Sequence, residues 1–294
     1  IGADMCAIEE AKDFLREVPE HQPFMATSCC PAWAAMAKKM FPEFKMYISM
    51  AMSPMVLTAR MLKAQYPEAK IAFIGPCSAK KLEASRRSVR SDVDFVLTYE
   101  ELQGMIEAKG IDWNAITKEE EVPLNHASGQ ARLFAVGGGV AQSVIDVIKK
   151  WDPEREVKVV AAQGLSECKK MLMLAKAGKY NGYLLEGMCC PGGCINGGGM
   201  PNIPANIKNF VDYRALRAKA LYDEDAGKEL NLLADTAYAK LGEMQNSLSE
   251  LRMQKLSAEK DVESADASIR GSAMRLAENT KKVLSLNLSI ASTN

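Results

Sequence analysis

The alternation of apolar and polar positions divides most of the chain into short strand-like runs and longer helix-like stretches. Continuously apolar runs bounded by turn residues predict buried strands at residues 23–26, 71–75, 157–161 and 182–185. Helical spacing between these runs predicts helices, among them residues 54–65 and 140–150. Strands that alternate with helices are typical of α/β proteins. We therefore expect an α/β fold, a layered domain with mainly parallel sheets flanked by helices.

The pattern changes after residue 230. A mostly apolar row recurs there every seven positions, at Leu241, Leu248, Lys255, Val262, Ile269, Leu276, Val283 and Ile290. This spacing is typical of the apolar seam of a coiled coil. A single helix cannot bury such a stripe, so two interpretations stay open: a helical hairpin folded back on the first domain, or a coiled coil that forms a homodimer. We expect two domains, residues 1–230 and a helical coiled-coil-like extension at 231–294.

Composition excludes several classes of protein. The 294 residues have a formal net charge of +0, so nothing indicates a nucleic-acid or anionic-membrane partner. No run approaches the roughly 18 apolar residues of a membrane span, and the acidic start IGADMCAIEE lacks the basic region of a signal peptide. We therefore expect a cytoplasmic protein. In that setting its eight cysteines, with two adjacent pairs, favour metal ligation or thiol chemistry over disulfides.

The first cysteine motif is TSCCPAW at residues 27–33, directly after a predicted strand. Pro31 suits the first turn of a helix. Cys30 would then lie near a helix N-terminus, where backbone N–H groups and the helix dipole favour a thiolate and hence metal binding. Adjacent cysteines rarely serve one metal in the same role, so one can ligate while the other faces elsewhere. The alternative is a pair of buried structural thiols.

Two further motifs follow predicted strands. In GPCSAKKLE, at residues 75–83, Cys77 is a candidate ligand, and a turn would return the ammonium of Lys80 to the same site to neutralise an anionic cluster. In EGMCCPGGCINGGG, at residues 186–199, Cys190 and Cys194 are separated by Pro-Gly-Gly. The glycines allow positive φ angles and let backbone N–H groups approach cluster sulfurs closely.

Together the motifs provide four thiolates, from Cys30, Cys77, Cys190 and Cys194. Four thiolates fit a cubane [4Fe–4S] cluster. Zinc also accepts four thiolates. A zinc site, however, has no need of a lysine, of Met188 or of a wall of glycines, so the iron–sulfur interpretation is favoured.

In this order the three motifs resemble the active-site signature of [FeFe]-hydrogenases, TSCCPxW, PCxxKxxE and ExMxCxxGCxxGGG. The resemblance covers about residues 1–230 and implies reversible H₂ oxidation and proton reduction at an H-cluster. That group is a [4Fe–4S] cubane joined to a diiron subcluster with CO, cyanide and a bridging dithiolate. By resemblance the four cysteines hold the cubane, and Cys194 bridges to the diiron unit. The family domain normally begins ahead of residue 1, so the resemblance implies that residues 1–230 lack its N-terminal part.

The resemblance also implies roles for side chains around the cluster. Lys80 would bond a cyanide, Met188 would pack against the diiron ligands, and Cys29 would pass protons to the amine of the dithiolate. Implied partners are H₂, protons, an electron carrier such as ferredoxin, and maturation proteins.

The family's proton path continues from the thiol through a serine and two acidic residues, which Ser49, Glu10 and Asp13 match here. Glu10 and Asp13 are three residues apart and share a helix face. Without the resemblance, an acidic pair near a helix start is typical of a solvated first turn. The family's outer arginine aligns with Glu17, and Arg16 is adjacent.

Two residues depart from the usual family pattern. Gly75 stands where a methionine is usual, and Met55 stands where a glutamine is common. Both departures resemble sensory branches of the family. Three hypotheses follow: a hydrogenase, an H₂ sensor that signals through the C-terminal extension, and a hydrogenase-like iron–sulfur protein without a diiron unit, in cluster assembly or signalling. Retention of Cys29, Lys80 and Met188 argues against the third.

Overall fold

Helices and strands alternate along the chain, as the apolar pattern predicts. The structure is a computed structural model that describes residues 1–112, 115, 127–203, 211–226, 279 and 282. Its strands are β1 (Phe24–Ala26), β2 (Ala72–Gly75), β3 (Phe95–Thr98), β4 (Lys158–Gln163) and β5 (Tyr183–Met188). Its α-helices are α1 (Gly2–Glu17), α2 (Pro31–Met40), α3 (Pro54–Gln65), α4 (Ala79–Ala84), α5 (Tyr99–Ala108), α6 (Gly129–Leu133), α7 (Gly139–Trp151), α8 (Leu165–Lys176) and α10 (Tyr213–Ala226). Two short 3-10 helices are η1 (Pro42–Tyr47) and η4 (Cys194–Asn196).

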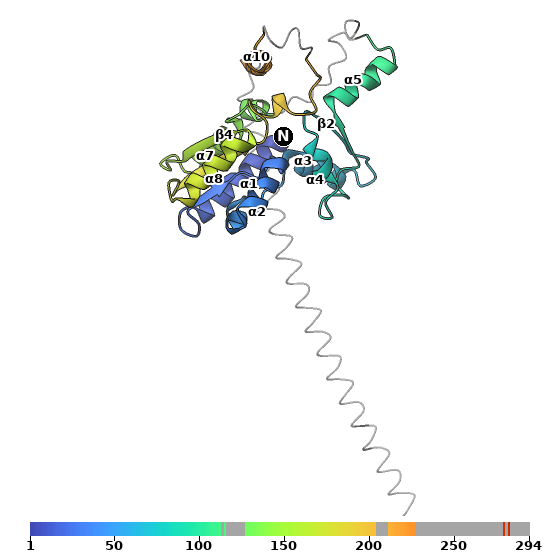
Figure 1. Cartoon of the computed structure of the whole chain (residues 1–294). Helices are drawn as coiled ribbons and strands as arrows, with labels where there is room; N and C mark the ends of the chain where they lie inside the picture. The colour runs from blue at the N-terminus through green and yellow to red at the C-terminus, as the bar shows by residue number, and fades with distance from the viewer. Residues whose placement is uncertain (113–114, 116–126, 204–210, 227–278, 280–281, 283–294) are drawn as a thin grey trace, which may run out of the picture. The chain divides into compact units, whose positions relative to one another are not determined.

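The larger sheet consists of three parallel strands in the order β1-β5-β4. Helices cover it on both sides: α2 and α8 pack on the face that carries Leu185, and α7 contacts β5 and packs beside α1 (Figure 1). The central strand β5 is therefore buried from Leu184 to Met188. Parallel sheets covered on both faces have continuously apolar strands, which is the pattern in the sequence.

A second parallel pair, β2 and β3, lies on the other side of α1 and α2 from α7 and α8 (Figure 1). Phe73 of β2 and Val96 of β3 pack against its core, which consists of Met55, Val56, Ala59, Val89 and Val93. This second sheet matters for the site because it carries the second cysteine motif.

Trp33 connects the first cysteine motif to the third. Its indole is fully buried and donates Nε1–H to the carbonyl of Thr27 at 3.0 Å. Gly187 of β5 lies against the ring, since a Cβ at that position would be 2.2 Å from Trp33 Cδ2. Only glycine leaves room for this contact, which brings the end of β5 close to the start of α2.

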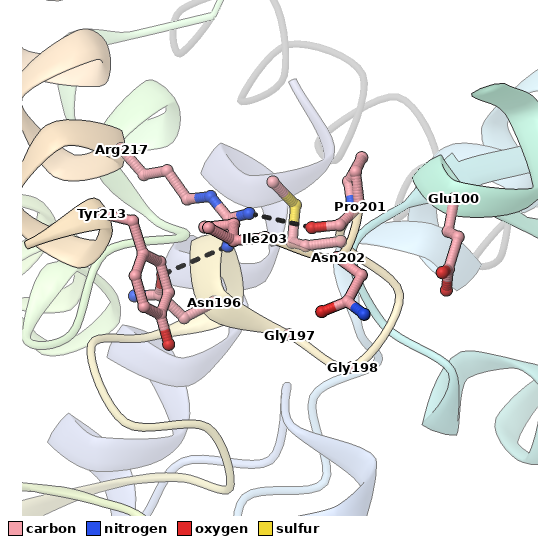
Figure 2. Close-up of a pocket in the computed structure, with 10 residues that line it drawn as sticks. Glu100, Asn196, Gly197, Gly198, Pro201, Asn202, Ile203, Tyr213 and Arg217 are labelled. Atoms are coloured by element: carbon pink, nitrogen blue, oxygen red, sulfur yellow. Dashed lines mark hydrogen bonds between the residues drawn. The ribbon is translucent and has the colours of Figure 1, made fainter. Parts of the chain in front are cut away.

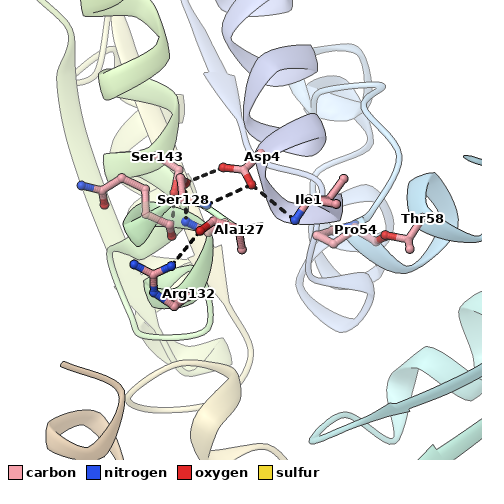
Figure 3. A network of polar contacts seen from close by, with 10 residues as sticks. Ile1, Asp4, Pro54, Thr58, Ala127, Ser128, Arg132 and Ser143 are labelled. Carbon is pink, nitrogen blue, oxygen red and sulfur yellow. Dashed lines mark hydrogen bonds and ion pairs between the residues drawn. The ribbon is translucent and has the colours of Figure 1, made fainter. Parts of the chain in front are cut away.

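A polar network ties α6 to α1 (Figure 3). Asp4 of α1 accepts hydrogen bonds from the hydroxyl and the backbone N–H of Ser128. The Ser128 hydroxyl in turn accepts from the N–H of Ala131 at 3.0 Å and so caps α6. Arg132 donates to the carbonyl of Ala127 at 2.7 Å. These bonds hold α6 beside the first helix.

The structure confirms the predicted fold class and most of the predicted elements. The helix at 54–65 has the predicted bounds, α7 extends one residue beyond each end of 140–150, and all four predicted strands are present. Strand β3 was not predicted, because its short apolar run passes directly into the capping box of α5 formed by Thr98 and Glu101. That junction has the pattern of a helix start.

The chain divides into two units, residues 1–234 and 235–294. All helices and strands named above belong to the first unit. The seven-residue row from Leu241 to Ile290 lies outside the described residues, so the predicted extension stays a prediction. Among the helices in the described ranges, none is both long enough and apolar enough to cross a bilayer.

Candidate functional site

The four candidate ligands line one cavity of about 270 Å³, although Cys77 is more than a hundred residues from Cys190 in sequence. Its other lining residues are Ala32, Ser78, Ala79, Met188, Cys189, Gly197 and Gly198. Among the residues that the structure describes, no three His, Cys, Asp or Glu side chains lie close enough to hold a single metal ion. The four thiols share the wall of one cavity.

Strand ends bring these cysteines together. Cys30 follows β1, and Cys190 and Cys194 follow β5, which pairs with β1 in parallel. Cys77 follows β2 of the other sheet. Open α/β sheets place their sites beyond the carboxyl ends of parallel strands. Here two such sheets contribute to one site.

Cys30 has the position that the sequence predicts. It is the N-cap of α2, with Pro31 at the first helical position. Its Sγ accepts a hydrogen bond from the N–H of Cys189 at 3.5 Å, a contact that joins the first and third motifs.

Burial holds the other thiols in their protonated form when no metal is bound. It raises the pKa of Cys190 to about 11 and that of Cys194 to about 12, and it raises the pKa of Cys77 as well. Metal binding must therefore displace protons from these thiols.

The glycine run in the third motif allows the backbone to pack closely against the second motif. A Cβ at Gly197 would lie 2.2 Å from the carbonyl oxygen of Pro76, so a side chain there is excluded. Gly199 donates its N–H to the same oxygen at 2.8 Å. Gly193 has a φ of 93°, a conformation that favours glycine. These contacts place Cys77 opposite Cys190 and Cys194.

Lys80 reaches the site from α4. Its buried ammonium donates to Glu83 Oε2 at 2.5 Å and to the carbonyl of Cys29 at 3.2 Å. Lys80 therefore contacts the backbone of the first motif, and it is not among the residues that line the thiol cavity. Sequence reasoning assigned no role to Glu83, although it belongs to the second motif. Its carboxylate compensates a cation that would otherwise be buried without a partner.

Glu10 is completely buried, so the alternative of a solvated first turn does not apply to it. Helix α1 begins at Gly2, so Glu10 lies in its interior. Its Oε1 accepts from the N–H of Ser28 at 2.8 Å and from the Ser28 hydroxyl at 3.3 Å, while Oε2 has no partner among the described residues. Burial raises the pKa of Glu10 to about 7. Burial also raises the pKa of Cys29 well above its usual range, and the nearby Glu10 carboxylate acts in the same direction.

A second group of polar side chains extends from the interior to the surface. The buried Ser49 hydroxyl donates to Asp13 Oδ2 at 3.2 Å, and Asp13 pairs with Arg16 at 2.8 Å. Arg16 also pairs with Glu17 at 2.6 Å, and its side chain is 66% exposed. The structure thus brings Ser49 and Asp13 together, and it supplies an arginine beside the position where the family has one.

Glu186 is a site residue that sequence reasoning missed. Its fully buried carboxylate accepts from the N–H groups of Gly138 and Ala141, each at 2.7 Å. It therefore caps the N-terminus of α7 from the middle of β5. Its place at the head of the third motif was the available signal, but the motif does not show that the partner lies in another helix.

Gly75, where the family pattern usually has a methionine, lies against the ring of Phe73. Both residues belong to β2, and a Cβ at Gly75 would lie 2.8 Å from the Phe73 ring. The ring also packs on the cluster that contains Met55, the second departure. Phe73 therefore occupies space that a side chain at Gly75 would need.

Restoring the family methionine at Gly75 should cost about 1–3 kcal/mol of the free energy of unfolding, because the new side chain overlaps Phe73. The cost should fall in the Phe73→Ala background, where the space is open. Urea unfolding of both single variants and the double variant measures this coupling. Gly104→Met is the control, since a Cβ there meets no atom within 4 Å. An equal cost with and without the Phe73 ring would rule out the ring as the obstacle.

Comparison with known proteins supports an iron–sulfur site. The family model for the iron-only hydrogenase large subunit, C-terminal domain, matches residues 1–198. Iron hydrogenase 1 of Clostridium pasteurianum is 30% identical over 264 residues, which cover 76% of this chain and 46% of that protein. Cytosolic iron-sulfur assembly component 3 of Bos taurus is 27% identical over 250 residues, which cover 67% of this chain and 52% of that protein. The chain thus spans about half the length of these relatives.

The fold is also similar to a solved structure. A variant of the [FeFe]-hydrogenase HydA1 of Chlamydomonas reinhardtii superimposes with a TM-score of 0.57. The match covers 75% of this chain and 72% of that protein, at 24% sequence identity. This likeness supports the α/β architecture with parallel sheets flanked by helices.

Proposed function

The chain belongs to the iron-only hydrogenase family, through the C-terminal domain of the large subunit, and from this premise we propose that it catalyses the reversible oxidation of H₂ to two protons and two electrons. The observation that carries the proposal is the single cavity lined by Cys30, Cys77, Cys190 and Cys194. Four thiols around one volume suit a [4Fe–4S] cubane. An iron–sulfur cofactor is the common feature of the family, and the diiron subcluster is our more specific proposal.

The cofactor would be held as follows. The four cysteines would ligate the cubane, and Cys194 would also bridge to a diiron subcluster with CO, cyanide and a bridging dithiolate. When bound, this group supplies the redox-active iron at which H₂ is split or formed. Met188 lines the same cavity and would exclude water from it. Lys80, held by Glu83, would hold an anionic ligand of the subcluster through its remaining N–H.

Proton movement would use side chains of this chain. Cys29 would exchange a proton with the cofactor and with Glu10. The Glu10 carboxylate lies near enough to raise the pKa of the Cys29 thiol, which supports this exchange. The unpaired Oε2 of Glu10 leaves room for one further hydrogen bond. Ser49 and Asp13 would carry the proton onward to the surface. Groups in such a relay must lie within hydrogen-bond reach, directly or through one water.

Glu10 should make stability depend on pH. Its pKa is raised from 4.5 to about 7 in the folded protein. The protonated Glu10 side chain therefore stabilises the fold fully below 4.5, its pKa in the unfolded chain, and this stabilisation is lost as the pH rises through about 7. Relative to Glu10→Gln, which cannot ionise, the free energy of unfolding of the wild type should fall by about 3 kcal/mol.

Urea unfolding of both proteins at pH 5 and pH 8 checks this prediction. The exposed Glu20 provides the control variant, Glu20→Gln, which should follow the wild type at both pH values. If the difference in unfolding free energy between wild type and Glu10→Gln does not change with pH, Glu10 does not titrate in this range.

A second candidate function is supported by the similarity to the iron-sulfur assembly component. In that case the chain would hold a [4Fe–4S] cluster without a diiron subcluster and would act in cluster assembly or signalling. Infrared spectroscopy of the matured protein separates the two functions. Bands of CO and cyanide, together with H₂ turnover, would support the hydrogenase. A cluster with neither band would overturn that proposal and leave the second function.

A sensory role is a further proposal, which rests on Gly75, Met55 and the sequence of residues 231–294. That segment would form a coiled coil that joins two copies of the chain. We also propose a cytoplasmic location, an electron carrier such as ferredoxin, and maturation proteins as partners. Deleting residues 236–294 should then convert a dimer into a monomer, which the mass in solution reports. An unchanged oligomeric state would remove the main support for a sensor.

A further inference from the structure

The loop at residues 194–201 has a cavity on each side. Gly197 and Gly198 line the thiol cavity, and they also line an outer pocket of about 360 Å³. Figure 2 shows this outer pocket between Glu100 on one side and Tyr213 and Arg217 of α10 on the other. Because neither glycine has a side chain, only backbone lies between the two cavities at these positions. The course of this backbone therefore determines one wall of the candidate cluster site.

A run of glycines needs contacts from outside to keep one conformation, because glycine loses more conformational entropy on folding than other residues. Gly199 donates to the carbonyl of Pro76 at 2.8 Å and accepts from the N–H of Glu100 at 3.1 Å. These bonds hold the end of the run. Its beginning, next to Cys194, is held by the N–H of Ile195, which donates to the carbonyl of Ala135 at 3.3 Å, and by a second contact that comes from α10.

Arg217 provides that contact and holds both ends of the loop. Its Nη1 donates to the carbonyl of Ile195 at 3.3 Å. Nη1 also donates to Asn196 Oδ1 at 3.5 Å, and Nη2 donates to the carbonyl of Pro201 at 3.2 Å, two bonds that are drawn in Figure 2. The rigid guanidinium fork can bind several separate acceptors at once, which a lysine ammonium does less well. The ring of Tyr213 lies against the guanidinium at 5.3 Å and limits its movement.

Helix α10 is itself anchored at its other end. Asp225 accepts from Arg132 Nε of α6 at 2.8 Å, and α6 is tied to α1 through Ser128. In the part of the chain that the structure describes, no carboxylate pairs with Arg217. Within those residues the positive charge of Arg217 faces backbone carbonyls and an amide, and it is held against the loop that begins with Cys194.

We propose that Arg217 is a positioning residue of the iron–sulfur site. It clamps the glycine loop that forms the cavity wall, and it places a positive charge near the anionic cluster. The inference rests on the [4Fe–4S] part of the proposed function and does not require the diiron subcluster. A nearby positive charge stabilises the more negative, reduced cluster, so Arg217 contributes to a higher midpoint potential.

Two substitutions separate the clamp from the charge in the full chain loaded with iron and sulfide. Arg217→Lys keeps the charge but loses the fork, so iron should be released to a chelator on the order of ten times faster, with the midpoint potential nearly unchanged. Arg217→Met loses both, so iron release should accelerate and the midpoint potential, followed by EPR during a redox titration, should fall. Arg214→Met is the matched control on the same helix, since the Arg214 guanidinium also lies near Tyr213, at 5.8 Å.

The inference is overturned if iron release and the midpoint potential of both Arg217 variants equal those of the wild type. If Arg217→Met does not fold, unchanged iron release in Arg217→Lys overturns it equally. An effect of the same size in Arg214→Met would also overturn it, because the loss of any arginine from α10 would then change iron release and the midpoint potential. A wild-type chain that takes up no cluster contradicts the proposed function itself, which distinguishes the two failures.

Discussion

Replacing Cys29 with alanine is expected to lower H₂ turnover about 100- to 10,000-fold, the range that a positioned proton-transfer group contributes. Cys29 is buried, and its thiol lies within the electrostatic influence of Glu10, whose carboxylate reaches the same turn through Ser28. Alanine cannot exchange a proton, yet it changes the volume of the site little. The iron content should therefore equal that of the wild type.

Two measurements on the matured protein check this expectation: H₂ turnover and iron per chain. Cys168→Ala is the matched control, since it removes a buried thiol that belongs to α8 and packs in the hydrophobic core. It should retain most of the turnover. If Cys29→Ala turns over like the wild type, Cys29 is not in the proton path. If it loses iron instead, Cys29 is a ligand.

Removing the carboxylate of Glu186 is expected to produce the largest loss of stability. Glu186→Ala leaves the N–H groups of Gly138 and Ala141 buried without acceptors, at about 1–3 kcal/mol for each. Glu186→Gln keeps one acceptor and turns an NH₂ group toward the other N–H, so its cost should be intermediate. Because Glu186 joins β5 to α7 just before Cys190, both variants should also bind iron less tightly.

Urea unfolding followed by circular dichroism measures these losses. The control is Glu167→Gln on α8, whose side chain is 57% exposed and pairs only with the exposed Lys170 among the described residues. It should stay within about 0.5 kcal/mol of the wild type. A Glu186→Ala protein as stable as this control would show that water can replace the carboxylate.

Much of the fold was predictable because its signals are local. The apolar runs of the buried strands and the helical spacing at 54–65 follow from burial and backbone geometry within a few residues. The placement of Cys30 at a helix N-terminus was also predictable, since Pro31 favours the first helical position. Strand β3 was not predicted, because a capping box directly follows its short apolar run and gives the segment the pattern of a helix start.

The sequence alone determined the candidate ligand set and the family. Two of the four cysteines, Cys190 and Cys194, lie in one motif, where the glycines between them indicate a tight turn. The other two, Cys30 and Cys77, belong to motifs that each follow a predicted strand. A binding motif that consists of a few consecutive residues can be recognised without a structure.

Only the tertiary structure decided how these local pieces meet. Glu10 is buried because α1 packs against α3 and α7, not because of its neighbours in sequence. Glu186 caps a helix that starts nearly fifty residues earlier, and Arg217 holds a loop from a separate helix. The physical reason is that burial, charge compensation and cavity shape depend on contacts between distant segments. Local propensity carries no information about which distant segments will be in contact.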